Sequence, residues 1–194
     1  MENSDPISLF SEWLGEAERI PGLKHPNAMQ LATATAAGQP SVRTVLLKGF
    51  SPNGFVFYTN YESQNGRELT ENPQASLCFY WDHIERQVRV GGSISRLGRV
   101  ESEVYFASRP RSSQIGAWAS RQGQEIPTRE YLEERVREFE EKFSGQPIPL
   151  PPYWGGFLLN PNKFEFWQGM AHRLHHRAAF ERTETGWRQK ILSP

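Results

Sequence analysis

The chain has 194 residues, and its 22 lysines and arginines balance its 22 aspartates and glutamates. This length predicts one domain with a sizeable core, and the zero net charge excludes a nucleic-acid binder held by bulk positive charge. An aromatic content of 12% argues against a disordered chain. No apolar run approaches the ~20 residues that a membrane span needs. The single cysteine, Cys78, excludes an internal disulfide and favours the reducing cytoplasm.

The first third of the chain predicts two helices around three strands. Apolar residues at helical spacing follow Ser4 and Asp5, either of which is a suitable N-terminal cap, and Pro6 suits the first helical turn. The turn at 51–54 predicts a hairpin between the second and third strands, and Ser63 is the expected cap of the second helix. The expected elements are a helix over about 6–20, strands over 28–35, 42–50 and 55–60, and a helix over 62–71.

The rest of the chain predicts strands on both sides of a helical insertion at about 99–143. Gly91 and Gly92, within an expected strand, predict a bulge or a close backbone approach. Antiparallel strands with inserted helices favour a mainly β, α+β fold, a closed or partly closed barrel that forms a single domain over 1–194. The expected elements are strands over 75–81, 86–94, 154–159, 164–168, 174–182 and 187–192, and helices over 100–108, 112–119 and 128–143.

Two groups of cationic and hydroxyl side chains bear on phosphate binding. Arg43 lies among apolar residues in a strand that ends at Lys48, and a buried charge there needs a partner. The alternative is that these two charges only mark where the strand leaves the core. Tyr105 and Arg109 lie one helical turn apart, close to Ser113 at the start of the next helix, whose N–H groups favour anions. The second group therefore favours a phosphate site.

A third group lies near the C-terminus. His172, His175 and His176 suggest a metal site, which the neighbouring Arg173 and Arg177 disfavour by charge repulsion. If this segment is a strand, Arg173, His175 and Arg177 share one face and suit phosphate or carboxylate. A solvated basic edge strand explains the same residues equally well, and the residue pattern alone leaves these two interpretations open.

Seven stretches of the sequence carry a family resemblance. They are RTVLLK at 43–48, FYTN at 57–60, ERQV at 85–88, YFASRPRSSQIGAW at 105–118, WGG at 154–156, EFWQG at 165–169 and RLH at 173–175. In this order they resemble the pyridoxine (pyridoxamine) 5′-phosphate oxidase family of FMN enzymes, and the likeness runs from about Pro6 to Pro194. The block at 108–117 is the most specific of the seven.

The resemblance implies a Greek-key split β-barrel that works as a homodimer with an FMN at each subunit interface. It implies oxidation of pyridoxine or pyridoxamine 5′-phosphate to pyridoxal 5′-phosphate, with O2 as acceptor and H2O2 as product, and no metal, nucleic acid or membrane partner. The residues implied to hold the substrate phosphate are Lys48, Tyr105, Arg109 and Ser113. Those implied to lie over the substrate ring are Arg173, Leu174 and His175, of which Arg173 and His175 are the expected catalytic pair.

The residues that the resemblance places around FMN come from most of the chain. They are Arg43, Thr44, Val45, Leu46, Leu47, Lys48, Tyr58, Thr59, Gln64, Asn65, Gln87, Gln122, Gly123, Trp167 and Arg177. The family has Arg-Lys at Gln64-Asn65, where the pair contacts the FMN phosphate, and our hypothesis is that Arg67 replaces part of the lost charge. The family also has Gln-Ser at Gln122-Gly123.

Two other functions stay open as alternatives. One is a flavin oxidase of the same fold with another substrate, as in phenazine biosynthesis, although such enzymes tend to lose the Arg-Pro-Arg-Ser-Ser block that is intact here at 109–113. The other is a non-catalytic protein that binds FMN or pyridoxal phosphate. The departures at Gln64-Asn65 support this second alternative, as does the expectation that the chain lacks the N-terminal segment that many family members fold over the substrate.

Overall fold

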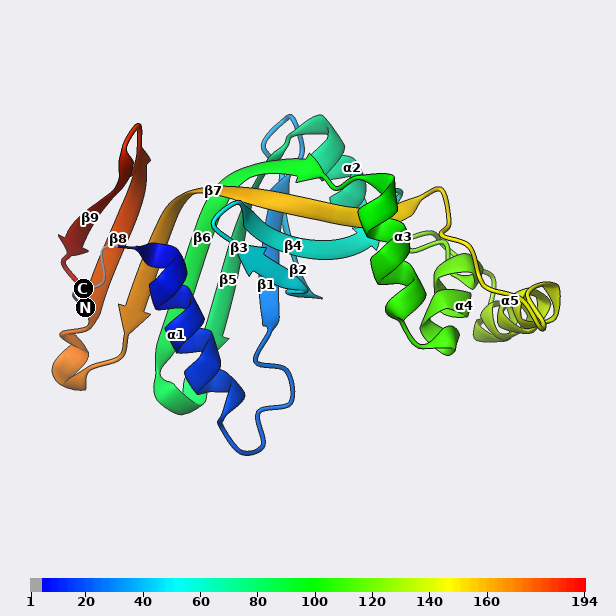
Figure 1. Ribbon diagram of the computed structural model, residues 1–194, viewed down its shortest axis with the longest axis horizontal. Coiled ribbons are helices and arrows are strands. Elements are labelled where there is room, and N and C mark those ends of the chain that lie inside the picture. Colours follow the sequence, from blue (N-terminus) through cyan, green and yellow to red (C-terminus); the bar gives the residue numbers. More distant parts are fainter. Residues whose placement is uncertain (1–4) are drawn as a thin grey trace.

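The computed structural model describes residues 5–194, and its centre is one strongly curled sheet (Figure 1). Strands and helices follow one another in the order that the sequence predicts, apart from two changes among the strands, and the helical insertion lies between the sixth and seventh strands. The strands are β1 (Ala28–Ala34), β2 (Pro40–Leu46), β3 (Gly49–Ser51), β4 (Gly54–Asn60), β5 (Gln74–Trp81), β6 (Arg86–Arg96), β7 (Trp154–Gln168), β8 (His176–Thr183) and β9 (Gly186–Leu192). The helices are α1 (Pro6–Glu18), α2 (Gln64–Glu71), α3 (Arg99–Ser108), α4 (Arg111–Ala119) and α5 (Arg129–Lys142), with short 3-10 turns η1 (Asp82–Ile84) and η2 (Ala171–Arg173).

The strands pair antiparallel throughout the described sheet. Their order is β2-β1-β5-β6-β7-β4-β3, and β8 joins β7 while β9 joins β8. The N–H of Lys48, just after β2, donates to the carbonyl of Val56 on β4 at 2.8 Å, which connects the two ends of the curled sheet. The predicted antiparallel, mainly β barrel with a helical insertion is therefore confirmed.

Helix α1 covers one face of the sheet and seals the main core. Asp5 caps it by accepting from the N–H groups of Ile7 and Ser8, while Ser4, the other expected cap, lies outside the described residues. Phe10 packs edge-on against Phe79, with ring centroids 4.9 Å apart. This aromatic contact fixes which face of β5 is buried, so alternate residues of the neighbouring strands point to the opposite, uncovered face.

Strand β7 corrects the prediction of two separate strands at 154–159 and 164–168. It is continuous because each half has its own partner on one edge, β4 for the first half and β8 for the second, while β6 pairs along the other edge. Pro161 sits opposite Gly92, where the register shifts as the glycine pair predicted. A Cβ on Gly92 would collide with the Asn160 carbonyl, so the bulge requires glycine there.

The strand expected over 42–50 is also corrected. It is two strands, because β2 pairs with β1 whereas β3 forms the predicted hairpin with β4. Leu47 lies in the break between them, buried in the core.

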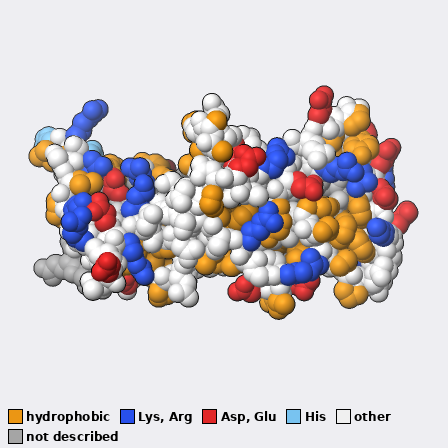
Figure 2. Space-filling model, turned by 90° about the horizontal axis from the view of Figure 1, so that it is seen from above, with side chains coloured by type: hydrophobic (Ala, Val, Ile, Leu, Met, Phe, Trp, Pro, Cys, Tyr) orange, Lys and Arg blue, Asp and Glu red, His pale blue; other side chains and the backbone are white. Residues whose placement is uncertain are grey.

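The helical insertion forms the opposite end of the molecule from β8 and β9 (Figure 1). It has its own small core, in which Phe106, Phe139 and Trp154 meet. From above, hydrophobic side chains gather over this helical end, while mixed acidic and basic side chains cover the other end (Figure 2). No helix within residues 5–194 is both long and apolar enough to cross a membrane.

Candidate functional site

A cavity of about 440 Å³ opens between β2, β4 and the junction of α3 with α4. It gathers predicted cofactor residues and predicted substrate residues in one place. From the first group its wall contains Thr44, Val45, Leu46, Tyr58, Thr59 and Gln122, and from the second it contains Lys48, Tyr105, Arg109 and Ser113. Trp154 and Pro110, for which the sequence suggested no role, complete the wall.

Arg109 is the most informative side chain in this cavity. Its Nη1 atom is buried and has no hydrogen-bond partner within residues 5–194. Burial lowers the pKa of the guanidinium, against the opposing effect of Tyr105. The guanidinium carbon lies 4.7 Å from the centre of the Trp154 ring, which holds the cation in place by a cation–π contact. A buried donor without a partner is costly, so this arrangement is explained by an anionic ligand.

Stacked aromatic rings form one wall of the cavity. The rings of Tyr58 and Tyr105 are 3.9 Å apart, and those of Tyr58 and Trp154 are 5.4 Å apart, all nearly parallel. Burial raises the pKa of the Tyr58 hydroxyl, with a smaller contribution from Tyr105. The Tyr58 phenol therefore stays neutral and available as a hydrogen-bond donor over the physiological range.

The N-terminal end of α2 borders this cavity. Asn65 is buried and donates from Nδ2 to the hydroxyl of Thr59 at 3.2 Å, while Ser63 donates to its Oδ1 at 2.9 Å. A Cβ on Gly123, which has a φ of 82°, would lie 4.0 Å from the backbone nitrogen of Gln64. The predicted pairs Gln64-Asn65 and Gln122-Gly123, far apart in the sequence, therefore lie next to each other.

Arg43 does not line the cavity. Its guanidinium contacts Glu68 on α2 at 3.4 Å and donates to the Ser41 hydroxyl at 2.5 Å, so it has the buried partner that the sequence demanded. Burial would raise the pKa of Glu68, but hydrogen bonds from Ser41, Thr33 and Gln64, with the charge of Arg43, lower it to about 2. This network joins α2 to β2 beneath the cavity.

A second group of predicted residues lies on the sheet face opposite α1. The register pairs Gln87 with Trp167 and Trp167 with Arg177, so these three form one row across β6, β7 and β8. The ring of His175 lies 4.7 Å from that of Trp167 at the end of the row. Arg173 and Leu174, next to it in the chain, are exposed.

The strand expected over 174–182 is wrong at its first two residues, Leu174 and His175. Arg173 belongs to η2, and β8 begins only at His176. His172 and Arg173 have φ values of 58° and 60°, a left-handed backbone that no strand adopts. Arg173, His175 and Arg177 therefore do not share a strand face, although all three stay at one end of the row.

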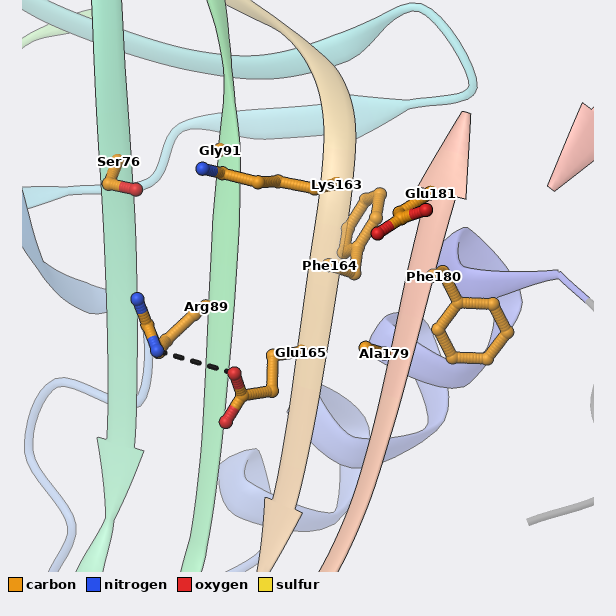
Figure 3. Close-up of a pocket in the computed structure, with 9 residues that line it drawn as sticks. All are labelled: Ser76, Arg89, Gly91, Lys163, Phe164, Glu165, Ala179, Phe180 and Glu181. Carbon is orange, nitrogen blue, oxygen red and sulfur yellow. Dashed lines mark hydrogen bonds and ion pairs between the residues drawn. The ribbon is translucent and has the colours of Figure 1, made fainter. Parts of the chain in front are cut away.

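Glu165 supports this second group, and sequence reasoning missed it. Its Oε1 accepts from the Nε and Nη2 atoms of Arg177 at 3.1 and 2.9 Å. Its Oε2 accepts from Arg89 at 3.3 Å, the contact drawn in Figure 3. Glu181 on the neighbouring strand instead pairs with two exposed cations, Arg188 and Lys190. Alternation along β7 is the signal that could have found Glu165, since it is two residues from Trp167.

The two groups of residues lie at opposite ends of the folded molecule. Figure 1 shows this from the positions of the α3–α4 junction and of the turn before β8. Arg67 belongs to neither: it is exposed, and its guanidinium donates to the carbonyl of Glu62. Across residues 5–194, no cluster of three or more His, Cys, Asp or Glu side chains has an arrangement that could hold a metal ion.

The antiparallel barrel with one cationic, aromatic-walled cavity defines the class of split-barrel proteins. A model of the pyridoxamine 5′-phosphate oxidase family matches residues 17–143, and a model of the pyridoxine 5′-phosphate oxidase C-terminal dimerisation region matches residues 154–194. The chain belongs to the pyridoxamine 5′-phosphate oxidase family, as the sequence resemblance predicted.

Individual relatives agree with this membership. A pyridoxine/pyridoxamine 5′-phosphate oxidase of Rubrobacter xylanophilus is 54% identical over 98% of this chain and 87% of its own length. One of Myxococcus xanthus is 50% identical over 98% and 92%. Among solved structures, PhzG of Burkholderia lata, in complex with tetrahydrophenazine-1-carboxylic acid, superposes with a TM-score of 0.92 at 33% identity, covering 100% of this chain and 94% of that one.

Proposed function

We propose that this chain is an FMN-dependent oxidase that converts pyridoxine or pyridoxamine 5′-phosphate to pyridoxal 5′-phosphate, with O2 as acceptor and H2O2 as product. Family membership and relatives of that name at about half identity support the activity. The observation that carries the proposal is the buried, partnerless Nη1 of Arg109 in the cavity. An arginine fork matches the oxygens of a phosphate ester better than any other side chain.

The substrate phosphate is held by Lys48, Tyr105, Arg109 and Ser113, which share the cavity wall. Two cations balance the phosphate charge, and two hydroxyls donate hydrogen bonds to its oxygens. Ser113 also lies in the first turn of α4, where backbone N–H groups favour an anion. Anchoring the phosphate at a fixed place holds the carbon to be oxidised at a fixed distance from the cofactor, which is worth a large part of the rate.

The surroundings of the cavity fit a flavin. Strand β2 ends the strand order, so backbone groups of Thr44, Val45 and Leu46 on its outer edge are available to the polar edge of a planar ring system. Thr59 and Gln122 supply further polar contacts, and the aromatic stack supplies a flat apolar wall. FMN, when bound, supplies the acceptor for a hydride from the substrate and passes the electrons to O2. The protein positions, donates hydrogen bonds and excludes water.

The end of α2 fits the FMN phosphate less well, because neutral Gln64 and Asn65 stand where the family has two cations. Arg67 is one helical turn from Gln64 on the same exposed side, and it replaces part of this charge by releasing its bond to the Glu62 carbonyl. Arg67→Ala should then weaken FMN binding about 5-fold, the effect of one exposed charge contact. A dissociation constant equal to that of the parent chain, measured by flavin fluorescence quenching, would refute this role.

Each active site combines the cavity of one subunit with the second group of its partner. The two groups lie too far apart in one chain to meet, and residues 154–194 match a dimerisation region. Trp167, Arg177 and Gln87 then complete the flavin site across the interface, while Arg173 and His175 cover the substrate ring. Residues 1–194 act as one domain, and the single free cysteine suits an enzyme of the reducing cytoplasm.

An aerobic assay tests the proposal. The purified chain is supplied with FMN and pyridoxine 5′-phosphate, and H2O2 and the aldehyde product are measured together. Both should appear in equal amounts, and dephosphorylated pyridoxine should react far more slowly. A yellow protein that yields neither product would leave only the binding function.

The likeness to PhzG favours one second candidate, a tricyclic carboxylic acid as substrate. Such a compound carries a carboxylate instead of a phosphate ester, so it needs fewer of the phosphate-holding groups. Turnover of tetrahydrophenazine-1-carboxylic acid that survives Arg109→Ala would support this candidate, because the phosphate anchor would then be dispensable.

A further inference from the structure

The turn that carries the expected catalytic pair is closed by one of its own side chains. The backbone N–H of Met170 donates to Nδ1 of His175 at 3.1 Å. Two more hydrogen bonds fix the ends of the turn, from the N–H of Gly169 to the Glu85 carbonyl at 2.8 Å and from the N–H of Leu174 to the Ala171 carbonyl at 3.2 Å. The imidazole is thus part of the turn's own framework.

This turn stores backbone strain. His172 and Arg173 both have positive φ, a conformation that costs energy for any residue with a Cβ and persists only where surrounding contacts impose it. The bond from Met170 to His175 is one of those contacts, and the Trp167 ring, 4.7 Å from the imidazole, restricts the ring on its other side. The position of Arg173 therefore depends on the ring of His175.

We infer that His175 works as a hydrogen-bond donor through Nε2 and not as the base that takes a proton from the substrate. A neutral imidazole has one N–H and one free lone pair. Here the lone pair on Nδ1 accepts from Met170, which puts the proton on Nε2. The nitrogen with the lone pair faces the Met170 N–H, so taking a proton there would break this bond, whereas Nε2 already carries its proton. This inference rests on the proposed function for the place of His175 over the substrate ring, and it assigns the chemistry performed there.

The consequence for catalysis is electrostatic. A fixed N–H at the end of the row formed by Gln87, Trp167 and Arg177 stabilises negative charge that develops on an oxygen or nitrogen of the substrate or cofactor. Arg173, positioned by the same turn, adds a permanent positive charge beside it. The proton released by the substrate leaves by another route, through water.

Histidine labelled with 15N at both ring positions tests the tautomer directly, without substrate or turnover. Long-range 1H–15N spectra at neutral pH are assigned with His175→Asn, and His176→Asn serves as the matched control on the adjacent residue. We expect the His175 signals to show a non-protonated Nδ1 and a protonated Nε2. A protonated Nδ1 would overturn the inference. Because no reaction is involved, that result would leave the proposed oxidase activity intact, and an inactive enzyme would leave the tautomer result intact.

Two substitutions then separate donor from base. His175→Asn keeps an acceptor near the Met170 N–H but loses the donor at the Nε2 position, so turnover should fall about 100-fold, as for loss of one fixed donor in other active sites. His175→Gln places an amide N–H near the Nε2 position and should recover about a tenth of the parent turnover, because an amide donates but takes no proton. Equal, complete loss of turnover in both variants, with unchanged circular dichroism and thermal midpoints, would overturn the donor role.

Discussion

The two ends of this chain prepare their residues for ligands in different ways. At the helical end, Arg109 is half-buried against an aromatic wall, and its buried Nη1 atom has no hydrogen-bond partner within the described residues. At the other end, Arg177 already has its hydrogen bonds, to Glu165 and to the Ser193 carbonyl, and Arg173 extends into solvent. The first end is an aromatic-walled cavity with an unsatisfied cationic donor, whereas the second is a rigid, open surface. Under the proposed function these are two half-sites, and each active site combines one of them with the other from a second copy of the chain.

Mixing two inactive variants tests most directly whether each active site needs one end from each of two chains. Arg109→Ala damages only the cavity and Arg173→Ala only the turn, so a mixed dimer keeps one intact site formed by the undamaged half of each chain. If the chains assort at random, half of the dimers are mixed, and each mixed dimer has one intact site out of two. Activity should therefore recover to about one quarter of the parent value. The two homodimers, measured alone at a substrate concentration no higher than the parent KM, should be nearly inactive, since Arg109→Ala acts mainly on KM. No recovery in refolded mixtures would show that each site is built within one chain.

Arg109 should govern the affinity for the substrate phosphate. Arg109→Ala removes a buried charge that only the ligand satisfies, so KM should rise about 300-fold, or ~3.4 kcal/mol, with a much smaller change in kcat. Steady-state kinetics with pyridoxine 5′-phosphate measures this split. Arg109→Lys is the matched control, since it keeps the charge but not the planar fork. A fall in kcat at unchanged KM would remove Arg109 from the phosphate site.

Acid should loosen the contact of α2 with β1 and β2 through Glu68. Its folded pKa of about 2 lies below the ordinary value of 4.5, so its stabilising effect is complete above pH ~4.5 and is lost as the pH falls toward about 2. The difference amounts to about 3 kcal/mol of unfolding free energy, measurable by denaturant titration from pH 6 to pH 2. Glu68→Gln should be less stable at neutral pH and should lose this part of the acid dependence. An unchanged acid slope in that variant would contradict the assignment.

Glu165 should affect the flavin more than the fold. Glu165→Gln weakens the hydrogen bonds that orient Arg177, so FMN should bind about 10-fold more weakly, a loss of ~1.4 kcal/mol. Fluorescence quenching of FMN measures the dissociation constant. Glu181→Gln is the matched control. Glu181 lies on β8, the strand next to Glu165, and its partners Arg188 and Lys190 are exposed. Equal losses in both variants would show a general charge effect.

Local residue patterns predicted most elements of the fold but not the way in which they combine. The helix over 129–142 and the pair β5–β6 followed from periodicity and turn residues alone. Strand β7 did not, because Pro161 reads as a break until Gly92 is seen opposite it on another strand. In the same way, the positive φ of Arg173 depends on contacts of the turn that no spacing rule contains.

The candidate site, like the fold, was predicted only where neighbouring residues in the sequence carry the signal. Residue chemistry indicated a phosphate site at Tyr105, Arg109 and Ser113, and the structure places all three in one cavity wall. The roles of the remaining residues came from the family resemblance, and they stay predictions. Glu68 and Glu165 were missed because each acts by holding an arginine that is distant in the sequence.

Strand β7 begins with Trp154, which lies beside Arg109, and ends at Gln168, next to Trp167 of the second group. Trp167 comes thirteen positions after Trp154, a span of at most about 43 Å in extended backbone. In the proposed dimer, the length of this strand sets the distance between the two active sites, so a change in its length would move both of them at once. One stretch of backbone would then couple the geometry of two separate reactions.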